Sequence, residues 1–193
     1  MALDLTPGSG QGWAARYNPS HVRRRAEILL DAEDPLEKMR RLLKLLGLLL
    51  LAAFLALQVR QPDRTNPPSD PADAIGRHLT VPVDVQAILD RSCRDCHSHD
   101  TRWPLYSYIA PISWHVGDHV SAGRQELNLS TWGQYDTDTV QDLLVAMCRQ
   151  VRGGEMPLPP YLRLHPSARL TADDISKVCT WTAAERRKLR EAE

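Results

Sequence analysis

The sequence predicts an all-α protein in which a small helical domain follows a single N-terminal transmembrane helix. Two observations lead to this fold class. An apolar run fills residues 42–59, and from residue 83 onward apolar side chains recur at the three- and four-residue spacing of amphipathic helices. No convincing alternation of apolar and polar residues indicates strands, and no internal repeat is visible.

The charge balance narrows the classes of partner. The 193 residues include 24 Lys and Arg and 24 Asp and Glu, so the formal net charge is zero. A protein that binds nucleic acid through its phosphates needs a basic excess. We therefore expect no nucleic acid partner.

The run LLKLLGLLLLAAFLALQV, from Leu42 to Val59, has the length and composition of a membrane anchor. Six basic residues lie between residues 23 and 41, whereas only two follow closely after the run. The positive-inside rule then places residues 1–41 in the cytoplasm and residues 60–193 outside it. In a bacterium this describes a single-pass inner-membrane protein with a periplasmic domain. A cleaved signal peptide and a buried helix of a soluble protein are the alternatives, and the long preceding segment disfavours the first.

The segments on either side of the anchor are expected to differ. Residues 1–41 read as a short N-terminal segment with a helix from Ser20 to Pro35. This segment serves either as a solvated topogenic sequence or as a dock for a partner membrane subunit. Residues 60–82 contain five prolines and predict an extended tether, which at about 3.1 Å per residue would reach roughly 50–70 Å. Such a tether would let the domain swing between partners, unless it is packed down.

The domain itself, residues 83–193, is expected to contain four helices. Asp84 caps the first, whose apolar face also carries Cys93 and Cys96. Pro111 opens the second, and the residues expected to face inward from it are Ile112, Val116 and Val120.

The third and fourth helices have clearer ends. The third is expected near residues 138–152, with Gly153 and Gly154 ending it. The fourth starts at Thr171, where Asp174 can complete a capping box. Loops are expected at about residues 97–110, 125–137 and 153–170.

Cys93, Cys96 and His97 form the C-x-x-C-H motif CRDCH, which is typical of the attachment site of a c-type haem. Each thiol can add across one vinyl group of the porphyrin, and the adjacent imidazole can bind the iron. A redox dithiol would be expected in a βαβ context, and a structural zinc site would need a second pair of ligands. The sequence therefore predicts one covalently bound haem c with His97 as an axial ligand.

The ligand on the other side of the iron is less constrained. Met156 lies in GGEMPLPPY, where two glycines allow a turn and three prolines stiffen the chain. A thioether ligand there would raise the reduction potential. Met147 is already explained as a core residue, while His115 and His119, four residues apart on one helix, are rival ligands. We expect Met156, with a histidine or an open position as the alternatives.

Two further cysteines, Cys148 and Cys179, fall on the inner faces of the third and fourth helices. Outside the cytoplasm they could form a disulfide. It would close a loop of about 30 residues and contribute roughly 3–4 kcal/mol by the chain-entropy model. Two buried free thiols are the alternative.

Two tracts, CRDCHSHDTRWPLYSYIAPISWHVGDHVSAGRQELNLSTW and GEMPLPPYLRLHPSARLT, resemble the bacterial haem-binding domain family. The resemblance covers about residues 80–185. Members of that family are small, exported or membrane-anchored proteins similar to cytochromes c. The resemblance implies thioether bonds, axial ligands and a disulfide at these positions: Cys93 and Cys96; His97 and Met156; Cys148 and Cys179.

The leading functional hypothesis is a membrane-anchored monohaem cytochrome that carries electrons in the periplasm, either as a tethered carrier or as a subunit of a respiratory or photosynthetic complex. Its partner would be a redox protein or a membrane complex. We expect an electron carrier rather than an enzyme. The alternatives are a haem-based sensor or peroxidase-like enzyme with an open sixth position, and a structural subunit whose haem is incidental.

Overall fold

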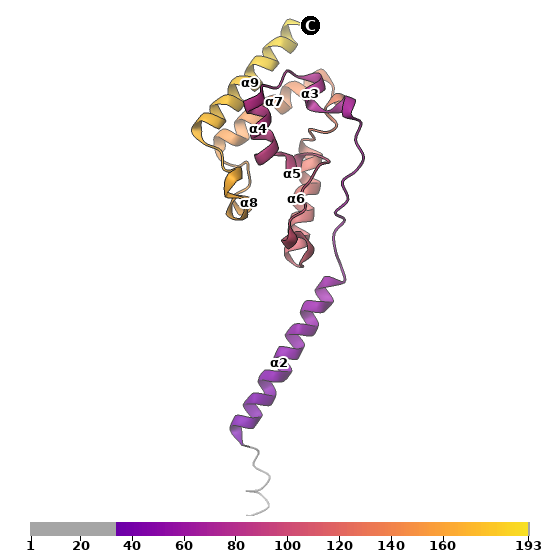
Figure 1. Ribbon diagram of the computed structural model, residues 1–193, viewed down its shortest axis with the longest axis vertical. Coiled ribbons are helices and arrows are strands. Elements are labelled where there is room, and N and C mark those ends of the chain that lie inside the picture. The colour runs from indigo at the N-terminus through magenta and orange to yellow at the C-terminus, as the bar shows by residue number, and fades with distance from the viewer. Residues whose placement is uncertain (1–33, 193) are drawn as a thin grey trace, which may run out of the picture. The chain divides into compact units, whose positions relative to one another are not determined.

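The structure is a computed structural model that describes residues 34–192, and this part of the chain is helical with no strand (Figure 1). The chain divides into two compact units, residues 1–53 and residues 54–193. The helix expected from Ser20 to Pro35 lies outside the described residues except for its last two positions. The all-α prediction is confirmed for the described part.

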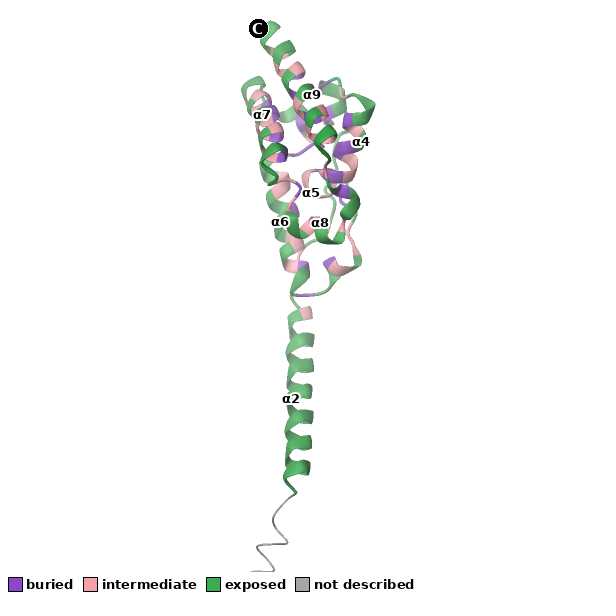
Figure 2. Cartoon of the chain, turned by 90° about the vertical axis from the view of Figure 1, so that its left-hand side faces the viewer, coloured by how far each residue is buried: buried purple, intermediate pink, exposed green. Residues whose placement is uncertain are grey.

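The first described helix, α2 (Pro35–Gln58), begins seven residues before the apolar run and includes nearly all of it. The Asp34 carboxylate accepts a hydrogen bond from the Leu36 backbone N–H at 3.0 Å and so satisfies one free amide of the first turn. Its 24 residues rise about 36 Å, which exceeds the roughly 30 Å of a bilayer core. Its side chains are exposed along the helix (Figure 2). The helix is therefore long and apolar enough to cross a membrane.

The segment after α2 differs from the predicted free tether, because its first residues are bonded to the domain. Gln58 pairs with both backbone groups of Ala110, accepting from the N–H at 2.9 Å and donating to the carbonyl at 3.1 Å. Arg64 donates to the Ser107 carbonyl at 3.1 Å, and its guanidinium lies 4.4 Å from the centre of the Tyr108 ring. Because of these contacts, the first part of the segment is not the freely extended tether that its prolines suggested.

The second half of the same segment belongs to the core of the domain. It forms two short helices, η1 (Pro71–Asp73) and α3 (Ile75–His78). Ile75 and Leu79 are only 5% and 6% exposed and join the main core cluster. The core therefore begins at Ile75, eight residues before the boundary expected at residue 83.

The remaining elements include the four predicted helices, the first of them divided in two. Their bounds are α4 (Val83–Ser92), α5 (Arg94–His97), η2 (Leu105–Tyr108), α6 (Ile112–Glu126), η3 (Trp132–Gln134), α7 (Thr137–Gly153), α8 (Pro159–Leu164), η4 (Pro166–Ala168) and α9 (Ala172–Glu191). Helix α9 packs against α7 and α4, and α5 packs against α6. The main core is centred on Leu89, Trp132, Leu144 and Trp181.

The helix ends show how the sequence sets these bounds. The Asp136 carboxylate accepts from the Thr139 N–H at 2.7 Å to start α7, and Gly154 ends it with a φ of 72°. The capping box of Thr171 and Asp174 is present at the start of α9, as predicted. Asp84 lies inside the first turn of α4 rather than at its cap, because the helix already begins at Val83.

One inward-facing prediction is wrong. Ile112, the first residue of α6, is 49% exposed, whereas Ser113 and Val120 are the buried residues of that helix. Val120 is buried as predicted and Val116 is half-buried, so the expected face is exposed only at its first residue.

Candidate functional site

The C-x-x-C-H motif lies where α4 ends and α5 begins. Cys93 has φ −123° and ψ −40°, which interrupts the helix, and α5 follows as a single turn. The amides of Cys96 and His97 both bond to the Cys93 carbonyl, at 3.2 and 3.0 Å. This turn holds Cys93, Cys96 and His97 together, and both thiols are free.

The ring of His97 is oriented by two backbone carbonyls from α6 and the residues after it. Its Nδ1 lies 2.8 Å from the Gly123 oxygen and 3.0 Å from the Leu127 oxygen. A carbonyl oxygen can only accept, so Nδ1 carries the proton and Nε2 keeps its lone pair. A backbone partner of this kind fixes the tautomer and the orientation of a histidine that binds a metal. His97 therefore offers Nε2 as a ligand atom.

The close approach of α6 to this turn requires a glycine at position 123. A Cβ atom there would lie 2.7 Å from the Cys96 carbonyl oxygen and 3.2 Å from its carbon. Both atoms are backbone, so neither can move aside without shifting the turn that carries His97.

Gly123→Ala is therefore expected to lower the free energy of unfolding by about 1–3 kcal/mol, as overpacking does. It should also weaken haem retention, because the Gly123 carbonyl holds the His97 ring. Chemical denaturation followed by tryptophan fluorescence measures the first effect, and haem content per chain measures the second. Gly76→Ala is the matched control, since nothing lies within 4 Å of a Cβ at that position. Equal behaviour of the two variants would contradict the steric argument.

The two thiols are poor candidates for dithiol redox chemistry. Burial, followed by the neighbouring Cys96, raises the pKa of Cys93 to about 12. Burial, followed by the charge of Asp95, raises the pKa of Cys96 to about 11. Both groups are neutral thiols at physiological pH, whereas a redox dithiol reacts through a thiolate. Within residues 34–192 no group of three or more His, Cys, Asp or Glu is placed to hold a metal ion.

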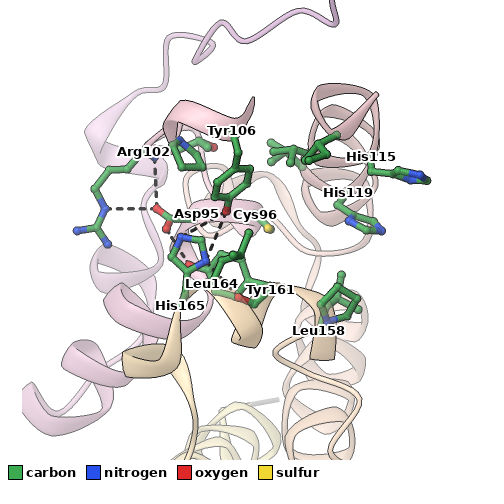
Figure 3. A pocket seen from close by; sticks show the side chains of 16 residues that line it. Asp95, Cys96, Arg102, Tyr106, His115, His119, Leu158, Tyr161, Leu164 and His165 are labelled. Carbon is green, nitrogen blue, oxygen red and sulfur yellow. Dashed lines mark hydrogen bonds and ion pairs between the residues drawn. The ribbon is translucent and has the colours of Figure 1, made fainter. Parts of the chain in front are cut away.

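Two cavities adjoin the motif, and each contains one of its cysteines. The first, about 320 Å³, is lined by Cys93 and His97 together with Met147 and Met156. Most of its other walls are aliphatic side chains: Ile88, Leu89, Leu127, Leu143, Val151, Leu170 and Val178. The second, about 150 Å³, is lined by Cys96 with the aromatic and histidine side chains shown in Figure 3. Two free thiols, an imidazole with a free nitrogen and largely apolar walls suit a flat apolar macrocycle such as haem.

The candidates for the second axial ligand are separated by these cavities. Met156 shares a cavity with His97, and its loop is tied to α7 because the amides of Glu155 and Met156 both bond to the Gln150 carbonyl, at 3.1 and 3.3 Å. Met147 lines the same cavity but belongs to the core, with 8% exposure. The structure thus brings together His97 and Met156.

The two rival histidines lie elsewhere. His115 and His119 line the cavity of Cys96, and both are exposed, with their ring centres 6.4 Å apart. Neither lines the cavity that contains His97. Their position favours Met156 over a histidine ligand.

The wall of the second cavity contains a small polar cluster that the sequence did not suggest. The Tyr161 hydroxyl donates to Asp95 at 2.9 Å, and Arg102 bonds to the same carboxylate at 3.3 Å (Figure 3). Burial and then the bond to Asp95 raise the pKa of Tyr161, so the phenol stays protonated and keeps donating. His165 stacks on Tyr161 with ring centres 4.0 Å apart. These contacts join α8 to the motif.

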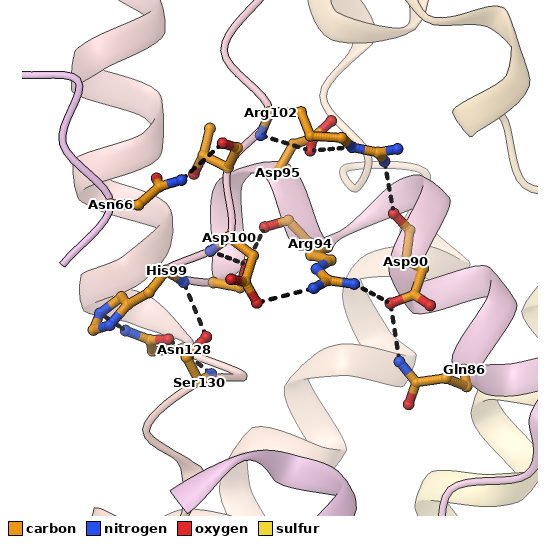
Figure 4. A network of polar contacts seen from close by, with 12 residues as sticks. Asn66, Gln86, Asp90, Arg94, Asp95, His99, Asp100, Arg102, Asn128 and Ser130 are labelled. Carbon is orange, nitrogen blue, oxygen red and sulfur yellow. Dashed lines mark hydrogen bonds and ion pairs between the residues drawn. The ribbon is translucent and has the colours of Figure 1, made fainter. Parts of the chain in front are cut away.

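A second set of polar contacts fixes the two residues between the cysteines and the loop that follows (Figure 4). Arg94 bridges Asp90 and Asp100 at 3.3 and 2.9 Å. Arg124 of α6 donates to the Ser98 carbonyl at 2.8 Å. An exposed charge pair of this kind contributes little to the free energy of unfolding. The main effect of these pairs is therefore to position the turn.

Cys148 and Cys179 form a disulfide that joins α7 to α9. This confirms the predicted pairing. The bridge closes a loop that contains Met156, and Val178, next to Cys179, lines the cavity of His97.

Comparison with known proteins agrees with this geometry. The model of a haem-binding domain family matches residues 52–184, more than half of the chain. No curated protein and no solved structure matches. The chain belongs to the haem-binding domain family.

Proposed function

We propose that this protein is a membrane-anchored monohaem c-type cytochrome that transfers electrons in the periplasm. The observation that carries the proposal is the arrangement around His97. Its Nδ1 is held by the carbonyls of Gly123 and Leu127, its Nε2 is free, and two free thiols precede it in the same turn.

Each residue of the site has a defined part in this proposal. Cys93 and Cys96 would hold haem c through thioether bonds, and His97 and Met156 would hold its iron. Bound haem would supply a one-electron redox centre. The walls around Cys93 and Met156 are mostly aliphatic, and an apolar site with a thioether ligand favours a high reduction potential.

Several features support a location outside the cytoplasm. Disulfides such as Cys148–Cys179 persist in oxidising compartments. Helix α2 has the length and hydropathy of a membrane span, and basic residues are concentrated on its N-terminal side. We infer that the N-terminus is cytoplasmic and that the haem domain lies in the bacterial periplasm.

Residues 58–66 are bonded to the rest of the haem domain at several points. Gln58, Arg64 and Asn66 all bond to backbone carbonyls of the domain, and Asn66 reaches the Thr101 oxygen at 3.0 Å. A domain held in this way is better suited to a fixed position in a respiratory or photosynthetic complex than to travel between distant partners.

Carbon monoxide binding tests whether the sixth coordination position of the iron is occupied. The full-length reduced protein, produced with periplasmic haem maturation, is expected to keep its low-spin spectrum when carbon monoxide is added. Met156→Ala should bind carbon monoxide, because the variant loses the thioether that occupies the sixth position. Absorption spectra before and after addition measure the difference.

Met147→Leu is the matched control, since it removes a second thioether from the same cavity while keeping the volume. It should behave like the native protein. If the native protein itself binds carbon monoxide readily, the sixth position is open, and a haem-based sensor or peroxidase-like enzyme replaces electron transfer as the best hypothesis.

A further inference from the structure

Exposed apolar side chains are concentrated in one short stretch of the haem domain. Beyond residue 60, seven large apolar side chains are exposed in the described part of the chain, and four of them lie within residues 105–112. These four are Leu105, Tyr108, Ile109 and Ile112, with exposed fractions of 80%, 50%, 43% and 49%. A concentration of exposed apolar side chains usually marks a surface that something covers.

This stretch is tied to the residues that directly follow the apolar helix. Ala110 exchanges two hydrogen bonds with the side chain of Gln58, the last residue of α2. The Trp114 indole N–H donates to the Arg60 carbonyl at 2.6 Å. Arg64 bonds to Ser107. Residues 105–114 are thus held at three points beside the end of α2.

The position of these bonds identifies what covers the surface. When α2 spans a bilayer, Gln58 marks the level at which the chain leaves the hydrocarbon core, and Ala110 is one hydrogen bond away from it. The residue types found near Gln58 are those expected at the surface of a membrane. Tyr108 and Trp114 are the aromatic types enriched at membrane interfaces, and the exposed Arg60 can reach lipid phosphates.

We propose that Leu105, Tyr108, Ile109 and Ile112 form a membrane-contact surface that rests in the lipid interface near the level of Gln58, the last residue of α2. This inference rests on the proposed membrane anchoring. Ile112 and two further residues near this surface, Pro104 and Tyr106, also line the cavity that contains Cys96. The membrane-contact surface would therefore bring one wall of the cavity that contains Cys96 to the lipid headgroups.

Photo-crosslinking in native membranes distinguishes lipid from protein as the neighbour of this surface. Benzoylphenylalanine is introduced into the full chain at Leu105 or at Ile109, and adducts are identified by mass spectrometry after irradiation. Val83 is the matched control, because it is 88% exposed but lies on α4. Leu49, within α2, reports on the anchoring itself.

Lipid adducts are expected at Leu105 and Ile109 in several-fold higher yield than at Val83, and also at Leu49. Protein adducts at Leu105 and Ile109, or yields no higher than at Val83, would overturn the membrane-contact surface while leaving the anchor in place. Absence of lipid adducts at Leu49 would overturn the anchoring and the inference with it. Because both test positions are exposed, the substitution leaves the core unchanged, and an unaltered far-ultraviolet circular dichroism spectrum confirms this for each variant.

Discussion

Replacing Cys93 and Cys96 together with alanine is expected to abolish covalent haem attachment completely. The two thiols are the only free ones among the described cysteines. The turn from Cys93 to His97, which we propose as the haem-binding turn, offers no other group that can form a thioether. Either single variant should keep haem through one bond and show reduced yield. Haem staining after denaturing electrophoresis, together with the intact mass of the chain, measures both effects.

The other cysteine pair provides the matched control for this experiment. Replacing Cys148 and Cys179 with alanine removes the same number of sulfur atoms but leaves the haem-binding turn intact. That variant should still carry covalent haem. Haem that stays bound to the Cys93 and Cys96 double variant after denaturation would contradict the proposed attachment.

The helical part of the fold could be predicted because its signals are local. The capping box at Thr171 and Asp174 depends on residues three apart, and the C-terminal end of α7 depends on the freedom of Gly154 to adopt a positive φ. The buried residues of α7, among them Val140, Leu144 and Val151, recur at the three- and four-residue spacing of one helix face. Such features involve neighbours along the chain, so a single sequence contains them.

The segment between the anchor and the domain could not be predicted in the same way. Five prolines suggested an extended tether, but Gln58 and Arg64 bond to carbonyls more than 40 residues away in the chain. A bond between one side chain and one distant backbone oxygen leaves no periodic pattern.

The same distinction, between features local in the sequence and contacts between distant residues, holds at the candidate haem site. The sequence identified Cys93, Cys96 and His97 through their spacing, but it contained no signal for the Gly123 and Leu127 carbonyls that orient the imidazole. The contact between Asp95 and Tyr161 could not be predicted either, because their hydrogen bond joins residues 66 positions apart. Motif spacing thus predicts which residues are candidates for haem attachment, whereas the groups that orient them are seen only in the fold.

Removing the disulfide should have the largest effect on stability. Cys148→Ser combined with Cys179→Ser opens a loop between residues 31 positions apart. In the chain-entropy model the bridge contributes about 3–4 kcal/mol by restricting the unfolded chain. The free energy of unfolding of the haem domain, measured by chemical denaturation, should fall by that amount. Dithiothreitol should lower the stability of the native protein to the same level and leave the variant unchanged.

The effect should extend to the iron, because the opened loop carries Met156 and the bridge joins the helices that line its cavity. With α7 and α9 free to separate, the thioether would occupy the sixth position for a smaller fraction of the time. The double serine variant is therefore expected to bind carbon monoxide more readily than the native protein and less readily than Met156→Ala. A variant that loses stability but still excludes carbon monoxide would show that the bonds of the Met156 loop to Gln150 suffice to position the ligand.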